Sequence, residues 1–556
     1  MTGDIAADVV IVGSGVAGAL LAARLAAAGV KVAILEAGAK VDRGEATQRF
    51  RDAMIKVPEC PYPATPEAMH PVSNDPDFWY RQQGPDKFRS TYVKVVGGTT
   101  WHWLGTSLRF LPHDFSLSST YGRGVDWPIG YGDLEPFYGE AEAEIGVSGD
   151  SSEPLGAPRT TNFPMPPIPP TFLDKAYAAA LAGTVYEVRA TPQGRNSVDR
   201  GDRPACCGNA SCIPVCPVQA KYDATVHLAL AAAKGAQLHE KTTAVFVELG
   251  ADRRVSAIRF KRWDGSEGRA IAKAFVIAAH AIETPRLLLA SRSQASPDGV
   301  ANGSDQLGRN LMDHPTQLSW ALADQPLWPY RGPLSTSGIE NLRDGDFRRQ
   351  RAAYRIEIGN DGWSWPTGAP VTTAQDLAGK GLRGKALDAA ILHQTSRHIR
   401  LASLMEQLPD PENRVTLDPT AKDIYGVPLP RLAYRLDDYV KAGLDAARKS
   451  HGEIFARLGT TEVQHSPEAQ GAGHIIGTAR MGSDPKTSVV DRDLRSHDHG
   501  NLFILGSSVF PTSTTANPTL TIAALSLRAV AAVKAGLSGE SKSPPCAATR
   551  PRAPRA

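Results

Sequence analysis

Four cysteines lie within eleven residues of one segment: Cys206, Cys207, Cys212 and Cys216. Thiolates spaced so closely on one loop can converge on a single metal centre, but they can hardly form two unstrained disulfides. The C-x3-C-P ending is similar to the last part of the cysteine runs of bacterial ferredoxins. Four thiolates also suit zinc, although the paired C-x2-C knuckles of zinc sites are missing. The segment therefore predicts an iron–sulfur centre, with zinc as the alternative.

A glycine-rich turn is the second chemical pattern. Residues 8–36 read in order as a buried strand, a turn, a helix and a second strand, and the turn holds Gly13, Gly15 and Gly18 as G-x-G-x-x-G. The first two glycines allow a tight turn and close approach of a pyrophosphate, and the third lets the helix pack on the strand. Glu36 follows the second strand, where a carboxylate accepts hydrogen bonds from ribose hydroxyls. This order predicts a dinucleotide-binding unit.

The elements that must position these residues can be read from the apolar runs. We expect strands at residues 8–12, 31–36 and 274–279, a helix at 19–28 and a helix start at 286–290. Short apolar runs of this kind, alternating with helices, are typical of a parallel sheet with helices on its faces.

Residues 321–469 show a different pattern, with strand-like pieces such as 432–436 and one clear helix. That helix has Asp437 as its N-cap, apolar residues at alternating spacings of four and three, and Gly459 as its stop. Its periodicity indicates core packing, so we expect His451 to be structural. The sequence predicts an α/β fold, in which a Rossmann-like domain carries a second α+β domain whose sheet is covered by helices.

The predicted organisation is discontinuous along the chain. The dinucleotide-binding domain comprises 1–320 and 470–535, with a lid or arm at 40–90 and the cysteine loop at 200–220; the substrate domain comprises 321–469, and 541–556 is a disordered tail. The long segments rich in proline, glycine, aspartate and arginine are typical of lids, inserted arms and interfaces.

Composition excludes several classes of protein. The 556 residues are 42% apolar and 21% charged, which argues against wholesale disorder and against a membrane-embedded protein. The net charge is +3 without a basic stripe, so nucleic acid is a poor candidate partner. The longest nearly apolar run, 9–23, is too short to span a membrane and lacks the flanks of a signal peptide. Taken alone, the chain is expected to be cytoplasmic.

Five further motifs reveal a family resemblance. They are VGGTTWHW at 96–103, AIETP at 281–285, GRNLMDHP at 308–315, PDPENRV at 409–415 and NPTLTIAAL at 517–525. Together with the glycine turn they resemble the glucose-methanol-choline (GMC) oxidoreductases, over about residues 5–535. The cysteine segment and the GGTTWHW run are similar to the catalytic subunits of bacterial membrane-bound dehydrogenases of glucose, fructose, sorbitol or gluconate.

The resemblance implies FAD in the dinucleotide site, held by the glycine turn and Glu36. It further implies that the backbone of Val245 meets the adenine and that Gly97 and Gly98 let the chain pass close to the isoalloxazine. His102 is then either covalently bonded to the flavin 8α-methyl group or merely hydrogen-bonded beside it. Both alternatives stay open.

Alcohol oxidation by hydride transfer needs a base for the hydroxyl proton, and a neutral imidazole, with an ordinary pKa of ~6.5, suits this role. The resemblance assigns it to His474, with Asn517 as partner. Asn517, Pro518 and Thr519 also read as a helix start whose positive dipole would face the reduced flavin. Close sugar-oxidising relatives tend to carry asparagine before this histidine, whereas Gly473 stands here, which puts a direct transfer of glucose specificity in doubt.

By resemblance the iron–sulfur centre is a 3Fe-4S cluster on Cys206, Cys212 and Cys216. Cys207 is then spare and available for a disulfide with a partner subunit. The resemblance implies a small subunit that carries the export signal, a multihaem cytochrome c as electron acceptor, and a place on the periplasmic side of the inner membrane through these partners. The expected substrate is a sugar or polyol. Two rival functions stay open: a flavin alcohol oxidase that uses oxygen, and a non-catalytic electron-transfer subunit.

Overall fold

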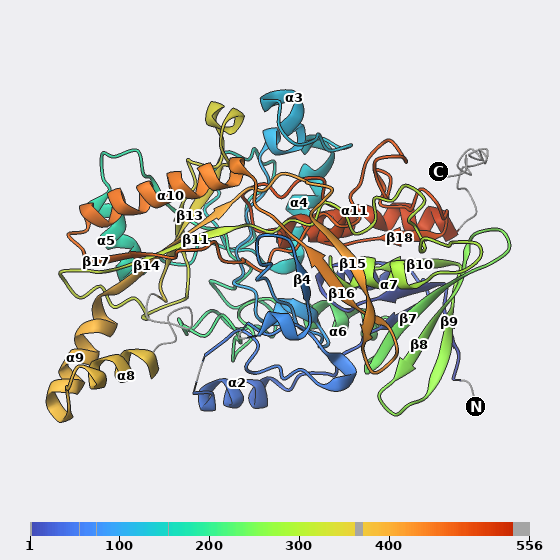
Figure 1. The fold of residues 1–556 in the computed structure, drawn as a ribbon, viewed down its shortest axis with the longest axis horizontal. Coiled ribbons are helices and arrows are strands. Elements are labelled where there is room, and N and C mark those ends of the chain that lie inside the picture. Colours follow the sequence, from blue (N-terminus) through green and yellow to red (C-terminus); the bar gives the residue numbers. More distant parts are fainter. Residues whose placement is uncertain (1–2, 55, 74, 154, 362–370, 538–556) are drawn as a thin grey trace.

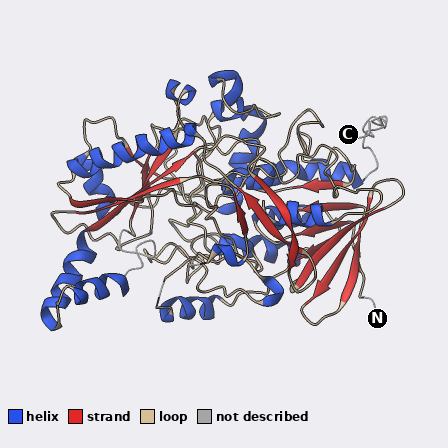
Figure 2. Cartoon of the chain, viewed as in Figure 1, coloured by secondary structure: helices blue, strands red, loops and turns tan. Residues whose placement is uncertain are grey.

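The computed structural model describes residues 3–537 apart from 55, 74, 154 and 362–370, so the predicted tail at 541–556 lies outside the described residues. Two large sheets lie toward opposite ends of the long axis, with loops, short helices and a small sheet between them (Figures 1 and 2). The predicted α/β class is confirmed, because one sheet is parallel and dinucleotide-binding in form, and the other is antiparallel.

The first sheet has five parallel strands, in the order β18 (Leu502–Ile504), β10 (Ala274–Ile277), β2 (Val9–Val12), β3 (Val32–Leu35) and β6 (Gln237–His239). The central strands are continuous apolar runs because both faces of the sheet are covered. The strands expected at 8–12, 31–36 and 274–279 all form, each slightly shorter than expected.

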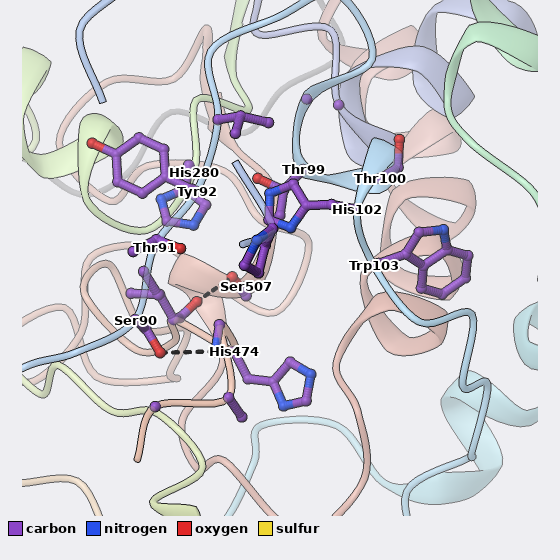
Figure 3. A pocket seen from close by; sticks show the side chains of 18 of the residues that line it. Ser90, Thr91, Tyr92, Thr99, Thr100, His102, Trp103, His280, His474 and Ser507 are labelled. Carbon is purple, nitrogen blue, oxygen red and sulfur yellow. Dashed lines mark hydrogen bonds between the residues drawn. The ribbon is translucent and has the colours of Figure 1, made fainter. Parts of the chain in front are cut away.

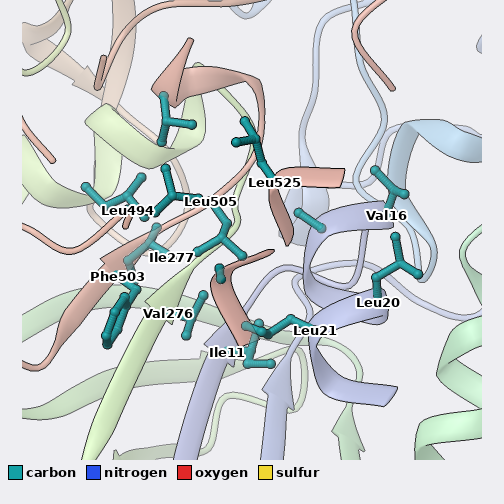
Figure 4. Packing of buried hydrophobic residues seen from close by; sticks show 14 of the residues in the cluster. Ile11, Val16, Leu20, Leu21, Val276, Ile277, Leu494, Phe503, Leu505 and Leu525 are labelled. Atoms are coloured by element: carbon teal, nitrogen blue, oxygen red, sulfur yellow. The ribbon is translucent and has the colours of Figure 1, made fainter. Parts of the chain in front are cut away.

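Three helices pack around this sheet: α1 (Val16–Ala27), α6 (Thr225–Ala233) and α11 (Thr519–Leu537). Figure 4 shows Leu21 of α1 beside Ile11 of the sheet, and Leu525 of α11 belongs to the same buried cluster. Helix α1 begins three residues before the expected 19, because Gly15 is its N-cap. By length and composition alone α11 could cross a membrane, yet it packs between α1 and α4 (Tyr131–Ile145) and half of its most apolar window is buried.

A four-stranded sheet lies at the same end of the molecule, in the order β1 (Ile5–Ala6), β9 (Glu267–Ile271), β8 (Val255–Arg262) and β7 (Thr242–Leu249) (Figure 1). Helix α7 (Glu283–Ala290) packs against β7 and begins three residues before the expected 286. The three-stranded sheet β15 (Arg414–Lys422), β16 (Pro428–Ala433) and β4 (Arg81–Gln83) also packs against α7. The strand expected at 432–436 overlaps β16 only at 432–433, because β16 ends at Ala433.

The second large sheet has six antiparallel strands, in the order β17 (Thr461–His465), β11 (Thr316–Leu322), β14 (His398–Met405), β13 (Tyr354–Gly359), β12 (Ser337–Ile339) and β5 (Val188–Ala190). The predicted range of the substrate domain, 321–469, is too narrow, because β5 completes the edge beside β12 and β11 begins at Thr316. Strand β5 could not be predicted, since three residues are too few to show an alternation of apolar and polar side chains.

Helix α10 (Asp438–Arg457) covers the six-stranded sheet and is N-capped by Asp437, as predicted. His451 is buried between Ser319 and Ser403, with a hydrogen bond of 2.7 Å to each hydroxyl, which confirms its structural role. The remaining helices are α2 (Arg43–Asp52), α3 (Leu117–Tyr121), α5 (Phe172–Ala180), α8 (Val371–Gly379) and α9 (Gly384–Arg397). Helices α8 and α9 form a hairpin that projects from the body (Figure 1).

Candidate active site

A cavity of about 920 Å³ lies between the two large sheets. The glycine turn and the start of β7 line it from the side of the parallel sheet, and β11 and β14 line it from the antiparallel sheet. The predicted arm at 40–90 contributes Val57, Pro58, Ser73 and Pro76 to its wall. A cavity of this size between two units of a fold is typical of a cofactor and substrate site.

The glycine turn requires its glycines for two different reasons. Gly13 has a positive φ of 99°, and a Cβ there would lie 2.4 Å from the carbonyl oxygen of Ala278. A Cβ on Gly18 would lie 2.1 Å from the carbonyl oxygen of Gly13, so this glycine lets α1 approach the turn. A Cβ on Gly15 would meet nothing within 4 Å and would point into open space. Gly13 and Gly18 therefore serve the protein's own packing, whereas Gly15 leaves room for a ligand.

Glu36 is tied to this turn by three hydrogen bonds. Its Oε2 accepts from the N–H and the hydroxyl of Ser14, at 3.0 and 2.6 Å, and its Oε1 accepts from the N–H of Gly38 at 2.8 Å. Burial raises its pKa, while these donors oppose the rise. Glu36 lines the cavity beside the turn, where a ribose would lie if a pyrophosphate approached Gly15.

The GG pair of the VGGTTWHW run lies against the same turn. The N–H of Gly97 donates to the Ser14 hydroxyl at 3.0 Å, and a Cβ on Gly98 would lie 3.3 Å from the Cα of Gly15. Both glycines have positive φ, and Gly98 lines the cavity. The structure thus brings the two glycine motifs together, although 83 residues separate Gly97 from Ser14.

The position of Val245 fits the predicted contact with the adenine less well. The cavity wall includes the three residues before it, Thr242, Thr243 and Ala244, but Val245 itself does not line the cavity. It sits at a β-bulge between β7 and β8, where the register shifts between Ala244 and Phe246. A bulge places one extra, unpaired residue in one strand and so changes where the neighbouring side chains point. The sequence alone does not reveal it.

His102 borders the cavity at the end of the short 3₁₀ helix Gly98–Trp101 (Figure 3). It is 8% exposed, its Nε2 has no hydrogen-bond partner, and burial lowers its pKa to about 3. The ring is therefore neutral, and one nitrogen is free to meet a ligand. Both the covalent and the hydrogen-bonded alternative need such a nitrogen.

His474 and Asn517 come together on the cavity wall, with Asn517 Nδ2 3.3 Å from His474 Nε2. Figure 3 shows that His474 and His102 border the cavity from different segments. The other ring nitrogen of His474, Nδ1, lies 2.8 Å from Nδ1 of His314. Pro518 and Thr519 also line the cavity, so the N-terminal, positive end of α11 borders it as predicted.

Burial and the neighbouring His314 and Arg355 hold the pKa of His474 well below its ordinary value of 6.5. A lowered pKa keeps the basic, neutral form present at lower pH. We therefore expect the rate constant of flavin reduction to stay constant between pH 6 and 8 and to fall only well below pH 6.5. Stopped-flow flavin reduction at saturating substrate measures this profile, and a midpoint near 6.5 or above would contradict it.

Sequence reasoning missed Asp313 and His314. Both were part of the GRNLMDHP motif, but neither was assigned a role. Asp313 is 3% exposed; its carboxylate accepts the N–H of His474 at 2.9 Å and that of Ala472 at 3.2 Å, and it also accepts the hydroxyl of Ser90. The available signal was an acid next to a histidine within a motif of the family.

The four clustered cysteines line a second, much smaller pocket together with Arg195. All four are free thiols; Cys212 is buried, Cys206 and Cys216 are half-buried, and Cys207 is exposed. The N–H of Lys221 points at the sulfur of Cys216, at 3.5 Å. The four cysteines thus share one pocket, but among the described residues no group of three or more His, Cys, Asp or Glu side chains is arranged to hold a metal ion.

The cysteine pocket is connected to the cavity by two buried cations. Lys221 donates through Nζ to the carbonyls of Trp101 and Trp103, at 2.8 and 2.6 Å, on either side of His102. Arg195 donates to the carbonyl of Leu104, which also lines the cavity. The Nε and Nη1 atoms of Arg195 are buried without a partner. This environment suits an anionic group among the thiols.

Comparison with known proteins identifies the family. The sequence profiles described as GMC oxidoreductase match residues 165–316 and 409–526, and one described as an NAD(P)-binding Rossmann-like domain matches 11–80. The chain is 39% identical to the fructose dehydrogenase large subunit of Gluconobacter japonicus, over 95% of this chain and 98% of that protein. It is 28% identical to the 2-methyl-1,2-propanediol dehydrogenase of Mycolicibacterium austroafricanum, over 94% of each chain.

The fold is similar to that of pyridoxine 4-oxidase from Mesorbium loti, with a TM-score of 0.61 and 18% identity, over 95% of this chain and 99% of that chain. The family profiles and the 39% identity confirm the resemblance inferred from the motifs. The His474–Asn517 pair, the glycine turn and these matches lead to one conclusion: the chain belongs to the GMC oxidoreductase family.

Proposed function

We propose that this FAD-dependent oxidoreductase is a dehydrogenase that oxidises an alcohol group of a sugar or polyol. The observation that carries the proposal is the His474–Asn517 pair on the wall of the cavity, beside the positive end of α11. The 39% identity to a protein named fructose dehydrogenase large subunit supports the substrate class.

The residues divide the chemistry between them. His474 accepts the hydroxyl proton of the substrate at its neutral imidazole, and Asn517 orients the oxygen by its amide. FAD, when bound, supplies the acceptor for the hydride that leaves the carbon bearing this hydroxyl group. The glycine turn, Glu36, Gly98 and His102 would hold it, and the space left at Gly15 and the unpartnered nitrogen of His102 fit that group. A bond from His102 to the flavin is part of the proposal, and flavin that stays on the acid-precipitated chain would support it.

The electron route is a further part of the proposal. Cys206, Cys212 and Cys216 would hold an iron–sulfur cluster, which supplies a one-electron relay to a cytochrome c partner. The pocket that the four cysteines share beside Arg195 and Lys221 supports this. The side chains are not arranged to hold a metal ion in this structure, so the thiols would have to move closer together to bind the cluster. We also propose a small partner subunit, with exposed Cys207 available for a disulfide to it, and a place on the periplasmic side of the inner membrane.

A panel of sugars and polyols tests the substrate class. Purified protein should reduce an artificial dye with at least one of glucose, fructose, sorbitol or gluconate, and the same substrate should bleach the flavin without oxygen. Hydrogen peroxide formed at the rate of substrate oxidation would favour the rival function, an oxygen-using alcohol oxidase. Failure of every sugar and polyol to bleach the flavin would reject the proposal.

Replacement of Cys212 by serine tests the electron route. Cys212 is buried in the small pocket and does not line the cavity that His474 lines, so we expect substrate still to bleach the flavin while reduction of the cytochrome partner collapses. Cys60→Ser is a matched control, because Cys60 lies outside the cysteine pocket. Iron analysis and electron paramagnetic resonance on both variants give the metal content. Zinc in place of iron, or normal cytochrome reduction without a cluster, would rule out the relay.

A further inference from the structure

The hydrogen bonds around His314 have a single direction. Its Nε2 lies 3.2 Å from the carbonyl oxygen of Ser513 and 2.9 Å from that of Thr514. A carbonyl oxygen can only accept a hydrogen bond, so Nε2 must carry the hydrogen. His314 is fully buried, and burial lowers its pKa to about 4, so the ring is neutral. Its Nδ1 is therefore an acceptor without a hydrogen.

This acceptor determines which nitrogen of His474 is protonated. The two Nδ1 atoms lie 2.8 Å apart, and since His314 Nδ1 can only accept, His474 Nδ1 must donate. His474 is also neutral, because its pKa is lowered by burial, so its Nε2 carries a lone pair. Asn517 Nδ2, 3.3 Å away, donates toward that same nitrogen. The chain of hydrogen bonds thus runs in one direction, from Asn517 through His474 and His314 to the two carbonyls.

We propose that His314 is a positioning residue that fixes His474 in the tautomer whose Nε2 lone pair faces the cavity. This inference rests on the proposed role of His474 as the base. With the other tautomer, Nε2 would carry a hydrogen and could not take the hydroxyl proton of a substrate. His314 does not relay the proton further, because its own Nε2–H ends on main-chain carbonyls that cannot accept a proton.

The neighbouring residue supports the same geometry. Asp313 accepts the backbone N–H of both His314 and His474, at 2.7 and 2.9 Å, so one carboxylate fixes the two backbones relative to each other. The carbonyls that His314 holds belong to the segment just before Asn517. His314 therefore connects the base to the segment that carries its partner.

Two amide substitutions separate this role from a merely structural one. His314→Asn places an acceptor near the position of Nδ1 and loses the contacts to the carbonyls. His314→Gln reaches the carbonyls as Nε2 does and loses the acceptor for His474. If the tautomer matters, we expect His314→Gln to lower the rate of flavin reduction by about 10²-fold and His314→Asn to stay within about tenfold of wild type, with substrate dissociation constants changed by less than about threefold.

The reverse order of rates, with Gln above Asn, would show that His314 only supports the 513–514 segment and would overturn the proposal. So would equal rates in the two variants. The flavin spectrum and thermal melting verify that both variants fold.

A measurement on the wild-type holoenzyme covers the case in which neither variant folds. In protein labelled with 15N-histidine, the nitrogen resonances absent from a His474→Asn spectrum report the tautomer of His474 directly. We expect a protonated Nδ1 and an unprotonated Nε2, and the opposite assignment would overturn the proposal. This result does not depend on activity, so a failed substrate panel would reject the proposed function without touching the tautomer, and the reverse holds as well.

Discussion

Replacement of His474 by alanine should lower the rate constant of flavin reduction by at least ~10²-fold, because general-base catalysis typically contributes ~10² to 10⁴. The imidazole is the proposed base, and its Nε2 is the ring nitrogen that meets Asn517 at the cavity wall. The binding of FAD should persist, since the glycine turn and Glu36 do not contact His474. Anaerobic stopped-flow bleaching of the flavin at saturating substrate measures the effect.

His465→Ala is the matched control. His465 also lines the cavity, but its ring contacts Ser319 and not the His474–Asn517 pair. We expect its flavin-reduction rate at saturating substrate to fall by less than about tenfold, because a base is still in place. A His474→Ala variant that reduces its flavin as fast as the wild type would remove His474 from the mechanism and with it the proposed chemistry.

Three strands of the parallel sheet, β2, β3 and β10, could be predicted because their signals are local. Strand, turn and helix between residues 8 and 36 are neighbours in sequence, and the role of Gly18 follows from contacts inside that unit. Glu36 could be predicted from its position alone, because it directly follows β3. Ligands of such sheets bind at the carboxyl ends of the parallel strands. Local patterns of this kind can be recognised without knowledge of the rest of the fold.

The candidate site was predicted only where motif residues matched. His474 and Asn517 were found because their flanking sequences resemble the family. His314 was not, since its role depends on a ring contact across 160 residues, and no spacing in the sequence encodes that approach. Edge pairing of β5 and the bulge at Val245 were missed for the same physical reason: both depend on which distant strand lies alongside.

Alanine substitutions at two glycines of the turn should have large effects of different kinds. One should lower the stability of the protein and the other should weaken the binding of the cofactor. Gly13→Ala puts a Cβ 2.4 Å from a backbone oxygen at a positive φ, so it should destabilise the fold by about 1–3 kcal/mol for the backbone strain and a similar amount for the overpacking. Gly15→Ala meets no protein atom within 4 Å at an ordinary φ, so the melting temperature of the apoprotein should stay near that of wild type.

The expected effect of Gly15→Ala is on the binding of FAD and not on the stability of the fold. If the pyrophosphate approaches Gly15 closely, a methyl group there excludes it. Gly15→Ala should then fold but bind FAD about tenfold more weakly, because overpacking typically costs ~1–3 kcal/mol and ~1.4 kcal/mol is a tenfold change in affinity. Gly452→Ala, on α10 with open space around its Cβ, controls for the substitution itself. Flavin absorbance per polypeptide and calorimetry give both quantities. Full flavin content in Gly15→Ala would mean that the dinucleotide does not pass over this turn, and the cofactor site would then have to lie elsewhere along the cavity.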